Sequence, residues 1–324
     1  MPELVSLVVP IFNEEECLPL LREELTRVAD RIERERGLRV ETLLVDDGSS
    51  DRSWRAILDF AQADPRVRAI SFSRNFGHQA ALTCGYQLAR GDAVVTLDAD
   101  LQDPPEVVLD LLDAWRGGAD VVYAVRTQRQ GEGWFKRWSA DVYYRMFRRI
   151  GETDAPRDAG DFRLMSRRAV DALNALHEVH RYIRGMVGWL GYRTAVVEYR
   201  RRPRPAGRTK YSFFRMVRLA VSGIVSFSTF PLRLFYWVGM LSTIPFGVYV
   251  LVAFVQWYTQ DVPMPRGWMA MQVSIITFGC LNLLCLGIMG EYVGRIYEQS
   301  KNRPPFLIRE RIDVAESHAH ASSG

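Results

Sequence analysis

The first 125 residues alternate between short apolar runs and longer amphipathic segments. The short runs are rich in Val, Leu and Ile, like strands buried on both faces of a parallel sheet, and they cover residues 5–9, 40–45, 67–72, 93–97 and 121–125. Between the first two runs, apolar side chains recur at helical spacing, at Leu18, Leu21, Leu25, Val28 and Ile32. The pattern predicts strands that alternate with helices, and therefore an α/β fold with a mostly parallel, Rossmann-like sheet.

Two later stretches, residues 234–257 and 267–290, contain no charged residue. Each is long enough to cross the hydrocarbon core of a bilayer, which is about 30 Å thick. Trp237, Trp257 and Trp268 lie near their ends, where interfacial aromatic residues gather in membrane proteins. We therefore expect two transmembrane helices; a pair of buried core helices is the alternative.

Positive charges flank the two apolar stretches but are scarce between them. Arginine and lysine are frequent in residues 200–218 and again from residue 295 onward, whereas the connection carries only Asp261 and Arg266. The positive-inside rule then places both termini and the N-terminal domain on the cytoplasmic side of the cell (inner) membrane. Residues 210–232 are mostly apolar with cations at their start, which predicts an interfacial amphipathic helix or an ordinary helix packed beneath the domain.

These observations divide the chain into four parts. Residues 1–200 form the predicted cytoplasmic α/β domain, 201–232 a basic linker with the interfacial helix, 233–293 the two spans and 294–324 a cytoplasmic C-terminal tail. The net charge of +4 is too small to predict a nucleic-acid partner, and a homo-oligomer is compatible with the sequence. The four cysteines have neither zinc-site nor disulfide spacing, and the N-terminus does not read as a signal peptide.

Polar clusters follow four of the predicted strands, in residues 10–16, 45–51, 73–82 and 94–106. Ligands bind at the carboxyl ends of the strands in a parallel sheet, so the four clusters should line one crevice. Asp46, Asp47, Asp98 and Asp100 would make that crevice acidic. Carboxylate oxygens bind hard cations such as Mg²⁺ and Mn²⁺, which share their remaining positions with phosphates. The pattern favours a metal with a bound diphosphate.

Other phosphate-binding patterns are absent from the sequence. It has no G-x-x-x-x-G-K-[ST] loop, and no G-x-G-x-x-G follows the first predicted strand. A phosphatase with an Asp nucleophile in a D-x-D-x-T pattern would carry Thr or Val at position 102, where the chain has Gln102. A phosphoacceptor Asp like that of response-regulator receivers would leave the apolar C-terminal part unexplained.

Seven segments together resemble a known family: "VVPIFNEEE", "LLVDDGSSDRS", "RNFGHQAALTCG", "LDADLQDPPE", "DAGDFRLMSRRAV", "AGRTKYSF" and "MGEYVGRIYEQSKNRP". In this order, and with two C-terminal spans, they resemble the family 2 glycosyltransferases of the GT-A fold. Within that family the chain is similar to the polyisoprenyl-phosphate glycosyltransferases, of the bactoprenol glucosyltransferase and dolichol-phosphate mannosyltransferase type. One D-x-D motif alone would be weak support, but the segments cover almost the whole chain.

The resemblance implies roles for the acidic loops. Asp98 and Asp100 would be the D-x-D pair that meets Mg²⁺ or Mn²⁺, and the expected nucleotide-sugar site comprises Pro10, Asn13, Glu14, Asp47, Asp98, Ala99, Asp100 and Gln102. Within it, Asp47 would pair with the base. Asp51 is expected to cap the following helix rather than bind ligand. Gln102 and Asp103 would either touch substrate or start the helix that follows Pro104 and Pro105.

The implied acceptor is a lipid monophosphate, whose second pKa is near 6, so its oxygen is already a competent nucleophile at neutral pH. It needs compensating cations near the membrane, and the candidates by position are Arg126, Lys136, Arg137, Arg208 and Lys210. Each of these is equally well a solvated or snorkelling surface cation.

Asp161 and Asp100 are the catalytic candidates that the resemblance implies. Asp161 would orient the nucleophile or act as a base, or form a salt bridge with Arg163 or Arg126. Asp158 is a second candidate for this position. His78 is expected to be structural rather than basic because it belongs to a loop motif of the family.

The resemblance thus implies an inverting glycosyltransferase. It would move one sugar, with glucose from UDP-glucose as the first guess, from a nucleoside diphosphate sugar to undecaprenyl phosphate at the cytoplasmic membrane face. Two alternatives stay open. A processive polysaccharide synthase of the same fold would want more spans and a Q-x-x-R-W motif, of which only "KRW" is present. A non-enzymatic membrane scaffold or flippase component would have no need of four acidic loops.

Overall fold

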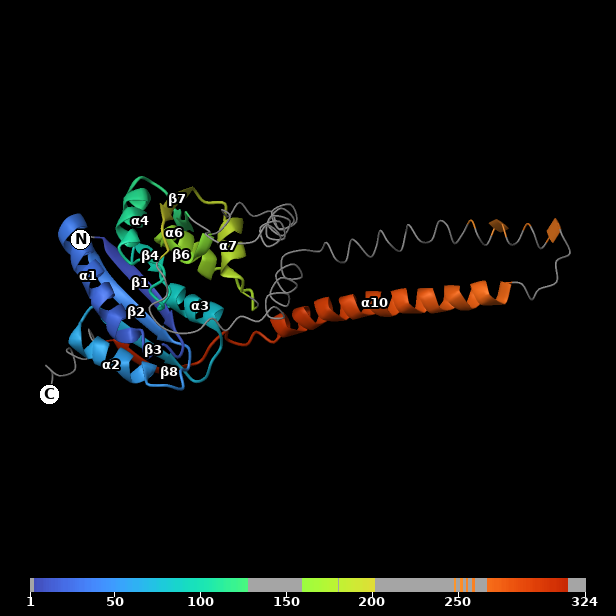
Figure 1. Ribbon diagram of the computed structural model, residues 1–324, viewed down its shortest axis with the longest axis horizontal. Helices are drawn as coiled ribbons and strands as arrows, with labels where there is room; N and C mark the ends of the chain where they lie inside the picture. Colours follow the sequence, from blue (N-terminus) through green and yellow to red (C-terminus); the bar gives the residue numbers. More distant parts are fainter. Residues whose placement is uncertain are drawn as a thin grey trace. The chain divides into compact units, whose positions relative to one another are not determined.

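The computed structural model describes residues 3–127, 159–179, 181–201 and 267–313, together with a few positions between 248 and 259. Contacts divide the chain into two units, Met1–Tyr211 with Arg303–Gly324, and Ser212–Asn302. The first unit holds the sheet and its helices, and the second holds one long described helix (Figure 1).

The described elements follow one another as strands and helices along the first unit. In chain order they are β1 (Leu4–Ile11), α1 (Leu18–Arg36), β2 (Arg39–Asp46), α2 (Ser53–Ala63), β3 (Val67–Phe72), α3 (His78–Leu88), β4 (Ala93–Thr96), α4 (Val107–Arg116), β5 (Val121–Arg126), β6 (Ala159–Ser166), α6 (Arg167–Asn174), α7 (Ile183–Trp189), β7 (Thr194–Tyr199), α10 (Trp268–Ser300) and β8 (Ile308–Asp313). The five predicted strands are confirmed within two residues at each end. The predicted helical face is confirmed too, because every apolar position named for α1 is buried.

The sheet has the strand order β7-β5-β6-β4-β1-β2-β3-β8. The run β4-β1-β2-β3 is parallel throughout. Strands β6 and β8 run antiparallel to their neighbours, while β7 is parallel to β5. The result is a GT-A-like α/β fold with a mixed sheet, parallel at its centre.

Helices cover both faces of the sheet (Figure 1). Alternate residues of β1, namely Val5, Leu7, Val9 and Ile11, join the apolar core that α1, α2 and α4 complete on one face. The opposite face carries α3, which packs very closely because Gly85 lies over Val8. A Cβ at Gly85 would stand 2.1 Å from the Val8 Cγ1 atom, so only glycine fits there.

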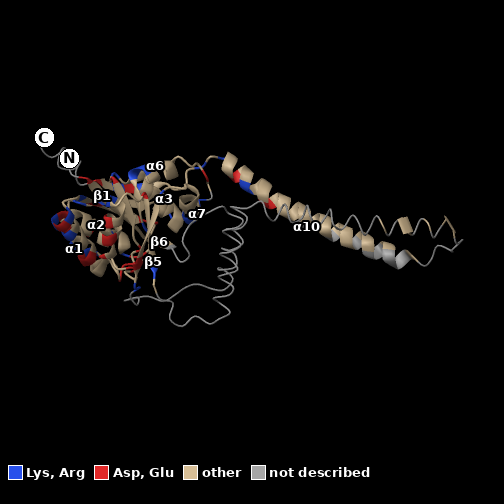
Figure 2. Ribbon diagram, turned by 90° about the horizontal axis from the view of Figure 1, so that it is seen from above, with Lys and Arg blue, Asp and Glu red and all other residues tan. Residues whose placement is uncertain are grey.

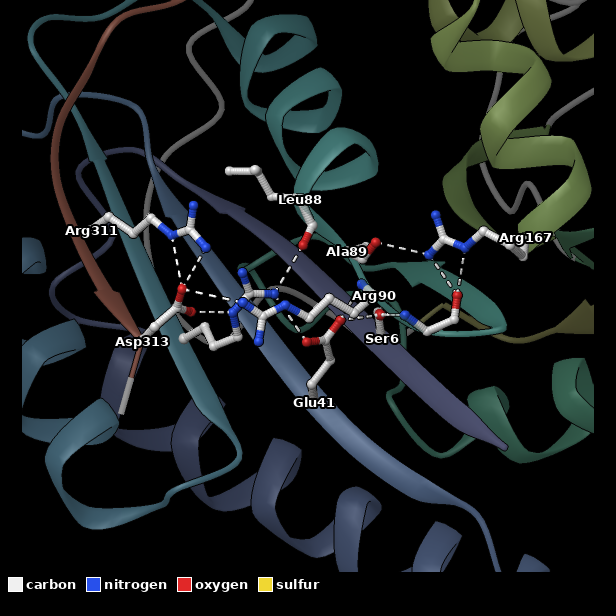
Figure 3. A network of polar contacts seen from close by, with 10 residues as sticks. Ser6, Glu41, Leu88, Ala89, Arg90, Arg167, Arg311 and Asp313 are labelled. Atoms are coloured by element: carbon white, nitrogen blue, oxygen red, sulfur yellow. Dashed lines mark hydrogen bonds and ion pairs between the residues drawn. The ribbon is translucent and has the colours of Figure 1, made fainter. Parts of the chain in front are cut away.

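Strand β8 brings the C-terminal segment back into the sheet beside β3. Its last residue, Asp313, forms an ion pair with Arg68 of β3, and both side chains are almost fully buried. Arg68 also donates to Glu41 at 3.0 Å, which in turn accepts a 2.5 Å hydrogen bond from the Ser6 hydroxyl (Figure 3). A buried polar row therefore crosses the sheet near the amino ends of its parallel strands. The sequence analysis placed residues 294–324 in a tail, and it missed this strand.

Helix α10 is the one helix in the described residues that is long and apolar enough to cross a membrane, by length and composition. The qualifying window, Thr277–Ser300, has a mean hydropathy of 1.3. The helix continues beyond residue 290, where Glu291 and Arg295 form a 3.0 Å ion pair, and Figure 2 shows its charged residues gathered toward one end. The predicted first span, 234–257, and the interfacial segment, 210–232, lie outside the continuously described residues.

Candidate functional site

The acidic loops meet at one edge of the sheet, as the sequence predicts. Strands β4, β1, β2 and β3 are parallel neighbours, so the loops that follow them leave from the same edge. We call this the catalytic edge. The buried polar row of Figure 3 lies toward the opposite edge.

The loops after β1 and β2 are bonded to each other. The Asn13 amide donates to the Ser49 hydroxyl at 3.0 Å, and the Asn13 side-chain oxygen accepts from the Ser50 amide at 2.8 Å. Asn13 adopts a left-handed backbone with φ 53°, which asparagine tolerates better than most residues. The Glu14 amide donates to the Ser53 hydroxyl at 3.0 Å. These contacts place Asn13 and Glu14 at the catalytic edge.

Asp51 lies just before α2, whose N-cap residue is Arg52 and has no side-chain cap. Its carboxylate accepts from the amide of Ser53, the first residue of that helix, at 2.9 Å. Pro10 is buried near the carboxyl end of β1, opposite Val45 of β2. It precedes the loop that carries Asn13, on the same edge of the sheet.

Asp47 organises the loop after β3. Its buried carboxylate accepts hydrogen bonds from the Asn75 side chain at 3.0 Å, the Phe76 amide at 2.7 Å and the Gly77 amide at 2.9 Å. Burial raises the pKa of Asp47, and the two amides offset only part of that effect. The neighbouring Gly48 has φ +67°, and a Cβ there would lie 2.4 Å from the Arg74 carbonyl carbon. The two loops therefore pack backbone to backbone.

The D-x-D stretch forms a tight turn directly after β4. Asp100 accepts a hydrogen bond from the Gln102 amide at 3.1 Å, and Leu101 between them is left-handed with φ 54°. Such a backbone is strained for leucine and is maintained by its surroundings. Asp98 and Asp100 are half-buried, and Ala99 between them is buried. Helix α4 begins only at Val107, and no side chain caps it, so the described contacts do not support a helix-starting role for Gln102.

Asp98 has a raised pKa. Burial raises it to about 6; the charge of His78 opposes the shift, while the carboxylates of Asp161, Asp103 and Asp100 add to it. A cation bound at this carboxylate would favour its charged form.

The D-x-D carboxylates fit a hard divalent cation, because carboxylate oxygens are the ligands that such cations prefer. Among the described residues, no group of three His, Cys, Asp or Glu side chains could hold a metal ion alone. Asp98 and Asp100 would thus share the ion with oxygens from a bound ligand.

Asp103 belongs to a separate polar cluster. Its buried carboxylate accepts from the Tyr199 hydroxyl at 2.5 Å, and its oxygens lie 3.5 Å from Arg126 and 3.6 Å from Arg201. Arg126 also donates to the Tyr199 hydroxyl at 3.1 Å. These contacts account for the buried carboxylate of Asp103 without helix capping or substrate contact. Asp103 positions Arg126 at the end of β5, and Arg126 is the acceptor-binding candidate that lies within the described residues.

Asp161, on β6, is buried among cations. Arg163 donates to it at 2.8 Å, Arg184 of α7 donates through two nitrogens at 3.1 Å each, and His78 Nε2 lies 3.2 Å away. Burial alone would raise the pKa of Asp161, but these partners hold it well below its ordinary range. Of the two salt bridges considered for Asp161, the pair with Arg163 is therefore confirmed.

His78 begins α3 and contacts Asp161, so its role in the described fold is at least structural. Burial lowers the pKa of His78, but the hydrogen bond with Asp161 and the charge of Asp98 raise it overall. The sequence reasoning missed Arg184 and Tyr199, because no motif marks them and only the pairing of distant strands brings them here. Four predicted site residues, Lys136, Arg137, Arg208 and Lys210, and the alternative Asp158 lie outside the described residues.

Comparison with known proteins supports the motif resemblance. A family model described as glycosyl transferase family 2 matches residues 6–173. The bactoprenol glucosyl transferase of Shigella phage SfX is 39% identical over 310 residues, covering 95% of this chain and 99% of its own. The glycosyltransferase YkcC of Bacillus subtilis (strain 168) is 41% identical over 310 residues, covering 95% and 94%. A solved structure of glucosyl-3-phosphoglycerate synthase from Mycobacterium tuberculosis, in complex with Mn²⁺, aligns with a TM-score of 0.48 at 18% identity, covering 70% and 80%.

Proposed function

The chain belongs to glycosyl transferase family 2 and is a glycosyltransferase, and from that premise we propose that it transfers one sugar from a nucleoside diphosphate sugar to a polyprenyl phosphate. UDP-glucose and undecaprenyl phosphate are the first choices, because the relative from Shigella phage SfX is named a bactoprenol glucosyl transferase and matches over nearly the full chain. The structural observation that carries the proposal is the acidic D-x-D turn at the catalytic edge, where the pKa of Asp98 is raised.

The proposed reaction is one in-line displacement at the anomeric carbon. An oxygen of the acceptor phosphate forms a bond to that carbon, and the bond to the donor's β-phosphate oxygen breaks, so the nucleoside diphosphate leaves with the electron pair. The configuration inverts, and an α-linked donor gives a β-linked lipid-phosphate sugar. The dianionic phosphate carries no proton on its attacking oxygen, so the reaction does not require a general base.

The residues divide between the two substrates. Pro10, Asn13, Glu14 and Asp47 would border the nucleotide, with Asp47 near the base and also shaping the crevice through the loop at residues 75–77. Ala99 and Gln102 would border the sugar, next to the D-x-D carboxylates.

Asp98 and Asp100 would hold Mg²⁺ or Mn²⁺ together with the diphosphate. When bound, the ion supplies positive charge to the leaving group. Asp100 already has a fixed orientation, since one of its oxygens accepts from the Gln102 amide.

The proposed lipid acceptor and the long apolar helix α10 support a membrane location. The proposed arrangement keeps a cytoplasmic domain at residues 1–200, a basic linker and interfacial helix at 201–232, two spans within 233–293 and a cytoplasmic tail at 294–324, with Ile308–Asp313 of that tail returning to the sheet. Both termini would lie in the cytoplasm.

A single product assay tests this function. The purified full chain is incubated with labelled UDP- or GDP-sugars and undecaprenyl phosphate, and the mixture is extracted with organic solvent. A single-sugar lipid supports the proposal. A polymeric product would instead indicate a processive synthase, and no product with any donor would favour a scaffold or flippase component.

The metal is tested with the Asp100→Asn variant, in Mg²⁺ or Mn²⁺ and in EDTA. We expect turnover to fall at least about 100-fold, as for loss of an electrostatic catalytic contact. Asp110→Asn, at an exposed position on α4, is the matched control and should keep wild-type turnover. Near-wild-type activity of the Asp100 variant, or full wild-type activity in EDTA, would refute the metal's role.

A further inference from the structure

The cations bonded to Asp161 outnumber its one negative charge. Arg163 and Arg184 both bond to Asp161, so two guanidinium groups meet one carboxylate there. The D-x-D turn has the opposite character, because Asp98 and Asp100 bring two carboxylates to it. The catalytic edge therefore holds both an arginine cluster and an acidic turn.

Arg184 is the arginine of this cluster that a ligand can reach. The Arg163 side chain is only 1% exposed, whereas that of Arg184 is 43% exposed. Arg184 meets the Asp161 carboxylate through Nε and Nη2, one bond to each oxygen. This double contact fixes the plane of the guanidinium and turns its other edge, formed by Nη1 and Nη2, away from Asp161. A planar guanidinium edge matches the oxygens of a phosphate.

Two further contacts fix this cluster relative to the D-x-D turn. The Ile183 amide, next to Arg184, donates to the Gln79 side chain of α3 at 3.0 Å. The Thr96 hydroxyl donates to the Asp161 backbone carbonyl, and Thr96 is the last residue of β4, two positions before Asp98. The start of α7 is thus hydrogen-bonded to α3, and the carboxyl end of β4 is hydrogen-bonded to β6, the strand that carries Asp161.

We infer that Arg184 binds the phosphate of the acceptor and that Asp161 is the positioning residue that holds its guanidinium in place; this rests on the proposed function. The acceptor needs a cation of its own, because the D-x-D pair and its metal compensate the donor's diphosphate. Asp161 in this role needs no proton transfer, which agrees with a nucleophile that is already deprotonated.

The test separates the two substrates with the variant Arg184→Gln in the full chain. We expect the KM for undecaprenyl phosphate to rise about 10- to 100-fold, the range for loss of a charge-assisted hydrogen-bond pair. The Kd for UDP-glucose should stay within about twofold. Asp161→Asn should also raise the lipid KM, whereas Arg184→Lys should recover part of the loss. Arg168→Gln is the control, since it removes an exposed arginine of α6 that pairs with Asp120.

An unchanged lipid KM in Arg184→Gln would overturn the inference, and so would an equal loss of UDP-glucose binding, which would assign Arg184 to the diphosphate. A circular-dichroism melt identifies unfolding; if Arg184→Gln does not fold, Arg184→Lys decides by the same KM comparison. Binding of undecaprenyl phosphate in nanodiscs is measured separately. If wild-type binds this lipid but transfers no sugar, the proposed function fails, and a loss of lipid binding in Arg184→Gln still supports the inference. Equal binding by both proteins contradicts it.

Discussion

The return of the chain to the sheet through β8 depends on one buried carboxylate, that of Asp313. Its side chain is 5% exposed and that of its partner Arg68 is 8% exposed. Replacing Asp313 with Asn removes the negative charge and leaves Arg68 in the sheet with less compensation. We expect Asp313→Asn to lower the free energy of unfolding of the sheet unit.

The magnitude follows from the partners that Arg68 keeps. Breaking a buried ion pair by removing one partner costs about 3–5 kcal/mol, because the other charge stays buried. Arg68 still donates to Glu41 at 3.0 Å and to the Leu88 carbonyl at 2.9 Å, so the loss should lie below that range, at about 2–3 kcal/mol. At about 2–4 °C per kcal/mol, the melting temperature should fall by roughly 5–10 °C.

Thermal unfolding of the detergent-purified chain gives the global effect, and amide hydrogen exchange locates it. Exchange should accelerate in β3 and β8 first, because these strands are joined by the pair. Asp171→Asn is the matched control; its carboxylate is 62% exposed in an i,i+4 pair with Arg167 and should change stability by less than about 0.5 kcal/mol. Equal melting temperatures for the two variants would refute the reasoning.

The pH dependence of this effect has a definite sign. Burial would raise the pKa of Asp313, but the hydrogen bonds from Arg68 and Arg311 hold it below its ordinary value. A depressed carboxyl pKa contributes stability that is present above the unfolded pKa, near 4, and is lost as the pH falls through the folded pKa. The difference in free energy of unfolding between wild-type and Asp313→Asn should therefore be constant from pH 8 to about pH 5 and become smaller below pH 4.

Two further predictions concern the catalytic edge. Gly48→Ala should lower turnover and destabilise the protein by about 1–3 kcal/mol, since its Cβ would lie 2.4 Å from the Arg74 carbonyl carbon. Gly37→Ala is the control: it also has a positive φ, +66°, but nothing lies within 4 Å of its Cβ, so it should cost only about 1 kcal/mol. Equal melting curves for the two variants would exclude the clash at Gly48. The pKa of Asp98, raised to about 6, means that the metal-free protein loses stability as the pH rises through about 4 to 6. Adding Mg²⁺ or Mn²⁺ should thus raise the melting temperature more at pH 7.5 than at pH 5, and an equal rise at both would count against Asp98 as a ligand.

The centre of the fold could be predicted because its signals are local. Strands such as Val67–Phe72 are buried on both faces and read as uninterrupted apolar runs. Helix α1 buries one apolar face, at the positions that the helical spacing predicts between Leu18 and Ile32. The parallel order of these strands then placed four polar loops, three of them acidic, at one edge without further information.

The edge strands could not be found in the same way. Strand β8 reads "IRERID", and most of its residues are exposed, so it lacks an apolar run. Its place depends on Arg68, which is distant in sequence, and on Phe306, which stacks on Phe72 with ring centroids 5.0 Å apart. Asp161 was found as a candidate through its family motif, but Arg184 was not, because nothing in its neighbourhood indicates a partner on β6.

Several aspartates of the catalytic edge are hydrogen-bonded within the fold. These contacts distinguish carboxylates with a structural role from those that would bind a ligand. Asp47 is satisfied by the loop after β3, and Asp103 by Tyr199. Asp161 is compensated by arginines, and its pKa is depressed. At Asp98, the carboxylates of Asp161, Asp103 and Asp100 add to the effect of burial and raise the pKa to about 6, and only the charge of His78 among the contributing groups opposes them. In the sequence these aspartates cannot be told apart, because each is an acidic residue in or near a strand. Their contacts in the fold decide which of them would bind a cation from outside the chain. By that criterion we assign the proposed metal to the D-x-D turn, and the proposed acceptor phosphate to the arginines bonded to Asp161.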